Sequence, residues 1–136
     1  IINQMIDDYV NKNSQKAIAF TSLGNLRFLS LVKICDAIVG NSSSGIIEAS
    51  SLKTATINIG HRQKGRIQAN TVVNTSVDVK EITKAFELIK SSEFKVRIKK
   101  GINPYGEGNA TNQIMNILKN MDIHSFQTKP FFDIKS

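Results

Sequence analysis

The feature that most constrains this fold is the alternation of short apolar runs with segments of helical periodicity. A strand buried on both faces is a continuous apolar run, and such strands are typical of parallel sheets covered by helices. The alternation therefore predicts an α/β fold, a Rossmann-like parallel sheet with helices on both faces. The apolar runs of strand length are 16–20 and 37–39, and two further strand candidates are the β-branched segment 54–59 and the segment 71–73.

Helical segments separate or follow these runs. Two of them repeat apolar residues at the spacing of one helix face: Ile82, Ala85, Phe86 and Ile89, then Ile114, Ile117, Leu118 and Met121. Asp78 and Asn109 stand where their side chains would cap the first turns of these two helices. Earlier helices are expected over 2–10, 25–35 and 45–52. The second of these is apolar nearly all round, which predicts a buried helix.

A chain of 136 residues can form one domain with its own core. We expect a domain over 1–123 and a tail over 124–136. The three phenylalanines of the tail would pack on this domain, on a further domain or on a second subunit, as in a homo-oligomer. The chain starts within a helical pattern and without methionine, so we expect it to be part of a longer protein.

Composition disfavours several classes of protein. No apolar run approaches the roughly 18 residues that a membrane helix requires. Cys35 is the only cysteine, so no disulfide or zinc cluster is expected, and its apolar neighbours predict a core thiol in the reducing cytoplasm. The net charge of +7 favours an anionic partner. Dispersed basic residues without an RNA-binding or helix-turn-helix motif disfavour nucleic acid. No metal or other cofactor is expected.

A serine loop, Gly40-Asn-Ser-Ser-Ser-Gly45, joins the run 37–39 to the next helix. Unpaired backbone amides at a helix start suit an anion, and Ser42, Ser43 and Ser44 add neutral donors. The alternative is that one serine only caps the helix. Glu48 follows on that helix, where a carboxylate either interacts with the helix dipole or accepts hydrogen bonds from ribose hydroxyls.

Two further loops follow. The basic loop, 60–66, carries Arg62, Lys64 and Arg66 after the run 54–59, at the edge where parallel sheets bind ligands. Arginine matches phosphate oxygens in bidentate geometry, although a solvated basic loop is the alternative. The loop 103–109 has turn residues that indicate a structural role, with Tyr105 or Glu107 able to face a ligand.

Together the three loops resemble one family. The segments 40–48, 58–66 and 103–109 are similar to the C-terminal half of UDP-N-acetylglucosamine 2-epimerases, in the same order. The Asn-Ser-Ser-Ser form resembles the hydrolysing branch. The family often has glycine where Lys53 stands and proline where Ala55 stands, and loss of that glycine weakens the expected helix end.

The resemblance implies the C-terminal half of a GT-B fold, in which two Rossmann-like domains enclose the active site. It implies that Ser42, Ser43, Ser44 and the Gly45 amide contact the UDP diphosphate. Glu48 would hold the ribose and Arg62 would neutralise the phosphates, with Lys64 and Arg66 as weaker candidates. The implied reaction converts UDP-N-acetylglucosamine, or a related bacillosamine-type substrate, and water to a free 2-epimerised sugar and UDP. The catalytic carboxylates would lie mainly in the first domain, so we expect this chain alone to be inactive.

Two other functions remain open at this point. The chain could be a non-catalytic module that binds UDP-sugars, or a domain of a glycosyltransferase with the same fold. Turnover that transfers the sugar to an acceptor without epimerisation would favour the second.

Overall fold

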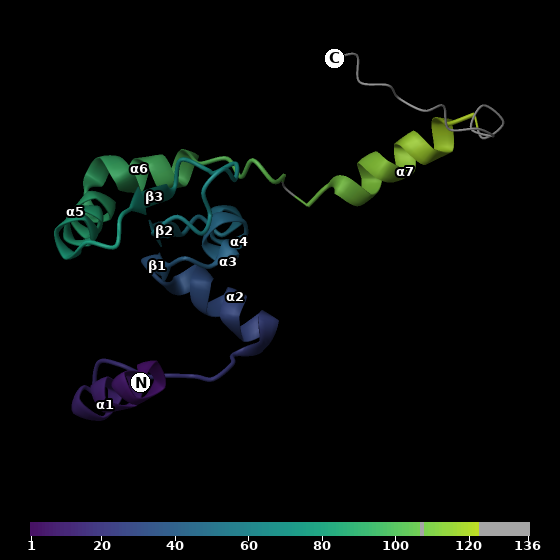
Figure 1. Cartoon of the computed structure of the whole chain (residues 1–136). Coiled ribbons are helices and arrows are strands. Elements are labelled where there is room, and N and C mark those ends of the chain that lie inside the picture. The colour runs from purple at the N-terminus through teal and green to yellow at the C-terminus, as the bar shows by residue number, and fades with distance from the viewer. Residues whose placement is uncertain (107, 123–136) are drawn as a thin grey trace, which may run out of the picture.

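Three parallel strands form the centre of the molecule (Figure 1). The computed structural model describes residues 1–106 and 108–122. The strands β1 (Ala37–Gly40), β2 (Ala55–Ile59) and β3 (Val72–Thr75) lie in the order β1-β2-β3. Their register pairs Ile38 with Thr56, and Thr56 with Val72. The parallel α/β sheet predicted from the apolar runs is confirmed for three of the four runs.

Seven helices accompany the sheet in the described residues. The expected helix over 45–52 is broken at Ile47 into two short helices, and the helix after residue 91 was not expected, because charged residues obscure its apolar face. The helices are α1 (Ile2–Lys12), α2 (Gly24–Ile34), α3 (Ser43–Ile46), α4 (Glu48–Ser51), α5 (Val79–Lys90), α6 (Ser92–Lys100) and α7 (Ala110–Asn120).

The central strand β2 is covered on both faces, as the alternation of side chains along a strand allows. On one face, Ala55 and Ile57 pack in a core with Ala85, Ile89 and Phe94 of α5 and α6. On the other face the buried Thr56 lies against α3, and its hydroxyl donates to the Gly45 carbonyl at 2.7 Å. The burial of nearly all of β2 follows from its position between two helical layers.

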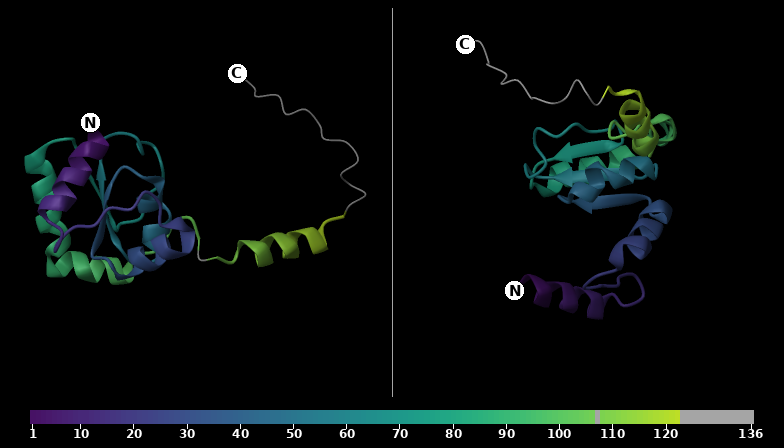
Figure 2. Two further views of the ribbon diagram at one scale, coloured as in Figure 1. Left: turned by 90° about the horizontal axis from the view of Figure 1, so that it is seen from below. Right: turned by 90° about the vertical axis from the view of Figure 1, so that its right-hand side faces the viewer.

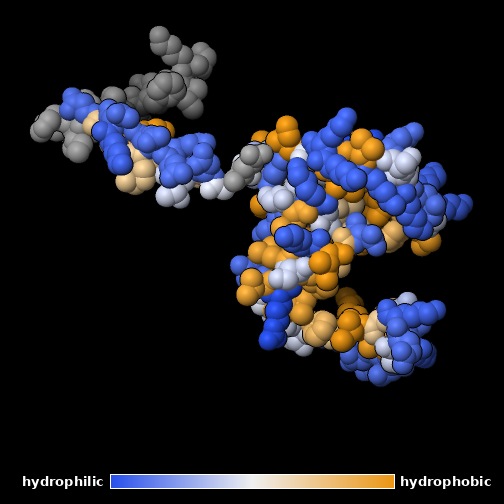
Figure 3. Space-filling model, turned by 180° about the vertical axis from the view of Figure 1, so that it is seen from behind, coloured by the Kyte–Doolittle hydropathy of each residue, from blue (hydrophilic) through white to orange (hydrophobic). Residues whose placement is uncertain are grey.

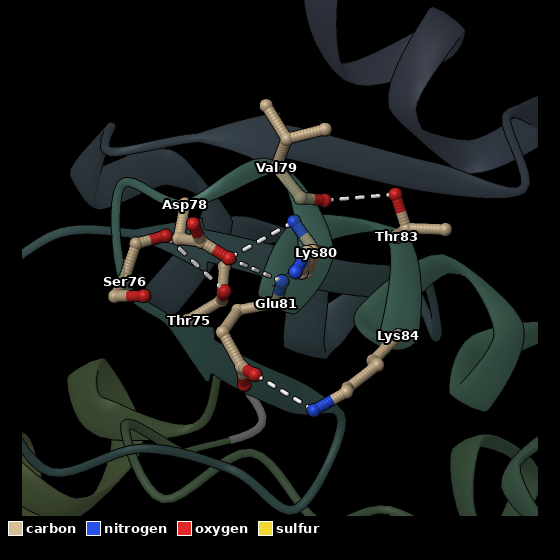
Figure 4. A network of polar contacts seen from close by, with 8 residues as sticks. All are labelled: Thr75, Ser76, Asp78, Val79, Lys80, Glu81, Thr83 and Lys84. Atoms are coloured by element: carbon tan, nitrogen blue, oxygen red, sulfur yellow. Dashed lines mark hydrogen bonds and ion pairs between the residues drawn. The ribbon is translucent and has the colours of Figure 1, made fainter.

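The predicted cap of α5 is confirmed (Figure 4). The Asp78 carboxylate accepts hydrogen bonds from the amides of Lys80 and Glu81, at 2.9 and 3.0 Å. One turn on, Lys84 donates to Glu81 at 2.8 Å. This hydrogen bond, with the charge of the carboxylate, raises the pKa of Lys84 above its ordinary value. The cap fixes where α5 begins, directly after the carboxyl end of β3.

Three expectations at the N-terminal side are wrong. The run 16–20 forms no strand, because no described strand lies beside it and Ile18 and Phe20 are exposed. The helix α2 is not buried, since Leu26 and Ile34 are each 80% exposed and Val32 is its one buried residue. Cys35, expected in the core, is exposed at the end of α2. All three errors share one cause, which is that no described element covers this side of the sheet.

The helix α7 extends away from the sheet (Figures 1 and 2). Asn109 precedes it as predicted but does not cap its backbone; its side-chain oxygen accepts from Asn112 at 2.9 Å. The expectations for Glu107 and for the tail over 124–136 fall outside the described residues. None of the described helices is long and apolar enough to cross a membrane.

Candidate functional site

The loops that follow the three strands lie at one edge of the sheet, because parallel strands end on the same side. The serine loop follows β1, the basic loop follows β2, and the α5 cap follows β3. Open α/β sheets bind their ligands at this edge. The structure therefore places the candidate loops where the fold favours a ligand.

The serine loop leads directly into α3. Gly40 adopts a φ of +148°, which a residue with a side chain rarely adopts. Ser42 is the N-cap of α3, and its hydroxyl oxygen accepts from the Ser44 amide at 3.3 Å. Ser43 and Ser44 form the first turn and are half-buried, and Gly45 is buried. The capping role of one serine is therefore present, and two further hydroxyls lie beside it.

Glu48 begins α4, so its carboxylate lies near a helix start, as its alternative interpretation requires. The residue is half-buried, however, and its Oε2 atom is buried without a hydrogen-bond partner in the described residues. Buried carboxylate oxygens are nearly always hydrogen-bonded in proteins. The helix dipole gives this oxygen no hydrogen bond, so it is an unsatisfied acceptor within the described residues.

The basic loop is tied to the serine loop through one carbonyl group. Arg62 donates to the Asn41 carbonyl oxygen at 3.0 Å, and Gln63 donates to the same oxygen at 2.7 Å. Arg62 is exposed, whereas Gln63 is 3% exposed and its Oε1 has no partner in the described part of the chain. The guanidinium of Arg62 therefore lies next to the loop that carries the three serines.

Lys64 and Arg66 are placed differently. With His61 they line a hollow of about 510 Å³ at the ends of β2 and β3. Its floor includes Asn58, which donates to Asn74 at 2.8 Å. The serines do not line this hollow. The structure thus joins Arg62 to the serine loop through Asn41, whereas Lys64 and Arg66 line a separate hollow.

A second hollow borders the serine loop and was not predicted. It measures about 540 Å³ and is lined by Ser42 and Ser44 together with residues of the segment 20–28, among them Phe20, Leu23 and Phe28. Sequence analysis missed these residues because 16–20 was considered only as a strand. A turn directly after a predicted parallel strand belongs at the same edge as the other loops, and that position could have indicated it.

In the predicted loop 103–109, Asn103 and Tyr105 are hydrogen-bonded to other segments of the domain. Asn103 is buried and donates to the Ile47 carbonyl at 3.1 Å and to the Ser51 hydroxyl. The Tyr105 hydroxyl donates to the Ile67 carbonyl at 2.9 Å. Lys53, where the resembled family often has glycine, has a φ of +58° and donates to the Gly101 carbonyl. These contacts hold α4 and the segment 60–71 in place beneath the site.

No group of three or more metal-ligating side chains occurs in residues 1–106 and 108–122. The candidate site offers hydroxyls, backbone amides, one arginine and one carboxylate whose Oε2 has no partner in the described residues. Such groups bind the phosphates and hydroxyls of a ligand through hydrogen bonds and charge.

This combination defines a class, the α/β domains that present a hydroxyl-rich helix start and an arginine at the ligand edge of a parallel sheet. Residues 1–119 match the UDP-N-acetylglucosamine 2-epimerase family, and the chain belongs to that family.

Its relatives include several sugar-nucleotide enzymes. It is 42% identical, over 98% of its length, to the GDP/UDP-N,N'-diacetylbacillosamine 2-epimerase (hydrolyzing) of Campylobacter jejuni. It is 36% identical to the polysialic acid biosynthesis protein P7 of Escherichia coli over 79% of its length. It is 30% identical to the UDP-N,N'-diacetylbacillosamine 2-epimerase (hydrolyzing) of Legionella pneumophila over 92%. The matches span 35%, 28% and 32% of these relatives, so the chain covers about a third of their length.

Proposed function

We propose that this chain forms the UDP-binding part of a hydrolysing nucleotide-sugar 2-epimerase with a GT-B fold. Two observations carry the proposal. The Glu48 Oε2 is buried without a partner in the described residues, at the start of the helix that follows α3, and Arg62 is hydrogen-bonded to the serine loop. A nucleoside diphosphate supplies the matching groups, since its ribose hydroxyls donate hydrogen bonds and its phosphates accept them. The description of the matching family names a UDP-sugar, which supports this ligand class.

In the proposed complex, Ser42, Ser43, Ser44 and the Gly45 amide contact the diphosphate. Arg62 exchanges the Asn41 carbonyl for a phosphate oxygen, which is a stronger, charge-assisted partner. The ribose hydroxyls donate to Glu48, and the uracil ring lies in the hollow bounded by Phe20, Leu23 and Phe28. Lys64 and Arg66 add positive potential that draws the anionic substrate toward this edge.

The proposed reaction removes the proton at C2 of the sugar and breaks the C1–O bond, which releases UDP and leaves a glycal. Water then adds its hydroxyl to C1, and a proton returns to C2 from the opposite face. The products are UDP and a free 2-epimerised sugar, N-acetylmannosamine when the substrate is UDP-N-acetylglucosamine. This chain stabilises the departing UDP, because the negative charge that develops there faces Arg62 and the amides at the start of α3.

A bacillosamine-type UDP-sugar is the second candidate substrate. Two relatives, at 42% and 30% identity, carry that substrate in their names. The bases that remove the C2 proton belong, in this proposal, to the portion of those relatives that the chain does not span.

The full-length gene product is tested with both UDP-sugars by following UDP release and the free sugar. We expect turnover of one of them, with UDP and the 2-epimerised sugar formed in equal amounts. Ser42→Ala and Arg62→Ala should each weaken UDP binding by about 10- to 100-fold, the value of one or two charge-assisted hydrogen bonds. Glu48→Gln should remove the preference for UDP over its 2′,3′-dideoxy analogue.

Lys80→Ala, an exposed cation on α5, serves as the control and should bind UDP as the parent does. Sugar transfer to an acceptor without epimerisation would identify a glycosyltransferase instead. UDP binding without turnover of either substrate would identify a non-catalytic module. Unchanged UDP affinity in both Ser42→Ala and Arg62→Ala would show that UDP does not bind at these loops.

Replacing Gln63 should reduce UDP affinity more clearly than it reduces the free energy of unfolding. Gln63→Leu removes the donor to Asn41 but also removes the unpartnered Oε1, so the free energy of unfolding should change by less than about 1 kcal/mol. In this variant Arg62 is the remaining side chain that donates to the Asn41 carbonyl. When Arg62 turns to a phosphate, the basic loop and the serine loop lose this connection. We expect UDP affinity to fall about fivefold. Gln68→Leu, in the hollow of Lys64 and Arg66, is the matched control and should leave affinity unchanged.

A further inference from the structure

The hollow lined by Lys64 and Arg66 is built from polar residues. It measures about 510 Å³ and lies where β2 and β3 end. Among the described residues that line it, none is acidic and none has a purely hydrocarbon side chain. By contrast, hydrophobic side chains gather on both sides of the gap between α1 and the body of the molecule (Figure 3). The hollow therefore offers hydrogen bonds and positive charge, with nothing to hold an alkyl chain.

Two paired asparagines contribute to the floor of this hollow. Asn58 of β2 and Asn74 of β3 are register partners, so their side chains lie on the same face of the sheet. The Asn58 Nδ2 donates to the Asn74 Oδ1 at 2.8 Å, and the Asn74 Nδ2 donates to the Gln68 Oε1 at 2.7 Å. Three carboxamides are thus joined in one chain of hydrogen bonds, and all three line the hollow.

Both ends of this chain have hydrogen-bonding groups that the described residues do not pair. Asn58 is 2% exposed, yet its Oδ1 accepts no hydrogen bond there, and the Gln68 Nε2 donates none. A buried polar group is costly unless it has a partner in the protein, in water or in a ligand. An acceptor at one end and a donor at the other match a ligand with hydroxyl groups, because a hydroxyl both donates and accepts.

The two cations of the hollow have no counter-ion in residues 1–106 and 108–122. The ion pairs found there join Lys84 to Glu81 and Lys90 to Glu87, all on α5. A phosphomonoester carries about 1.5 to 2 negative charges at neutral pH, and arginine binds phosphate oxygens in bidentate geometry. Two unpaired cations therefore match a phosphomonoester better than they match the single charge of a carboxylate.

We propose that this hollow is a second ligand site, which binds a small phosphorylated sugar separately from UDP. Lys64 and Arg66 bind the phosphate group. The sugar hydroxyls donate to the Asn58 Oδ1 and accept from the Gln68 Nε2. The site goes beyond the proposed function, which assigns these two cations only a long-range attraction for the substrate.

The arrangement of the two loops argues against a single site shared with UDP. The serines do not line this hollow, and Ser42 and Ser44 line a different one. Arg62 and Gln63, which belong to the same basic loop, are hydrogen-bonded to the Asn41 carbonyl and are absent from the lining. The basic loop thus contributes different residues to the two sites, so we expect both to be filled at the same time.

Titration calorimetry of the full-length protein with glucose 6-phosphate tests the proposal. We expect one molecule to bind per chain, with an affinity that changes by less than about threefold when UDP is saturating. Inorganic phosphate should bind about tenfold more weakly, because it brings no sugar hydroxyls to the carboxamides. Glucose, which lacks the charge, should show no binding in the same range of concentration.

Variants on both sides of the basic loop locate the binding. Arg66→Ala should weaken glucose 6-phosphate binding by about 10- to 100-fold, and Gln68→Leu by about fivefold. Lys80→Ala, an exposed cation on α5, is the control for charge and should bind as the parent does. Ser42→Ala should weaken UDP binding and keep the affinity for glucose 6-phosphate. Melting temperatures equal to the parent's show that the variants are folded, whether or not they bind UDP.

Four results would overturn the proposal. They are no binding of glucose 6-phosphate, its displacement by UDP, an equal affinity for inorganic phosphate, and parent-like affinity in both Arg66→Ala and Gln68→Leu. Displacement by UDP would make the hollow part of the nucleotide site. Binding of glucose 6-phosphate by a protein that turns over neither UDP-sugar would support this site and contradict the proposed function, so the two proposals fail separately.

Discussion

Replacing Phe94 with alanine should lower the free energy of unfolding by about 3–5 kcal/mol. Phe94 is fully buried, and it is the largest side chain in the core formed by β2, α5 and α6. The truncation removes the apolar area that the ring buries and leaves a cavity between the sheet and α6. A domain of this size has a free energy of unfolding of about 5–15 kcal/mol in total, so this one substitution removes a large part of it.

Denaturant unfolding with parent and variant measures the difference. Phe94→Leu is the first control, because it keeps most of the volume and should cost less. Arg97→Ala is the second, because the Arg97 guanidinium lies 5.0 Å from the centre of the Phe94 ring and its removal separates the cation–π contact from burial. A loss below about 1 kcal/mol for Phe94→Ala would mean that α6 does not pack on the sheet as described.

The sequence predicted the core side of this fold because local pattern and packing agree there. The segments that form β1, β2 and β3 are short and rich in apolar or β-branched residues, and the helix from Val79 has both a one-face spacing and a capping aspartate. Each of these patterns is local, so it can be recognised without knowing which element packs against it. The short chain also contains the partners these elements need, since β2 is covered by α3 on one face and by α5 and α6 on the other.

The N-terminal half was predicted less well for a physical reason. Lys16 to Phe20, α2 and Cys35 have apolar sequences that indicate burial, and each is exposed. A side chain is buried only where another part of the protein packs against it. The sequence of one segment does not show whether such a part is present. The edge of β1 that pairs with no described strand lies on the same side of the sheet.

The sequence predicted which loops lie at the ligand edge of the sheet but not their contacts. That the serine loop and the basic loop share one edge follows from parallel topology. The tether through Asn41, however, depends on Gln63, a residue with no motif value by itself. The separation of Lys64 and Arg66 from the serines depends on how the basic loop turns back. Those features are set by three-dimensional packing and are visible only in the structure.

Gly45 to alanine should destabilise the domain and weaken UDP binding at once. An added Cβ would lie 2.7 Å from the Thr56 methyl carbon, a distance that requires something to move. Thr56 has little freedom, because it is buried and its hydroxyl donates to the Gly45 carbonyl at 2.7 Å. Such overpacking typically costs about 1–3 kcal/mol. Alanine forms helices better than glycine by about 1 kcal/mol, which offsets part of that cost.

Thr56→Ser separates the two effects, because serine keeps the hydroxyl and lacks the methyl group. In a double-mutant cycle, Gly45→Ala should be destabilising beside threonine and neutral or stabilising beside serine. UDP affinity, measured by titration calorimetry, should follow the same pattern, since the clash pushes α3 and its serines away from β2. A binding loss that persists beside serine would show instead that the Cβ itself occupies ligand space, so the sheet contact and the phosphate contact of Gly45 can be told apart.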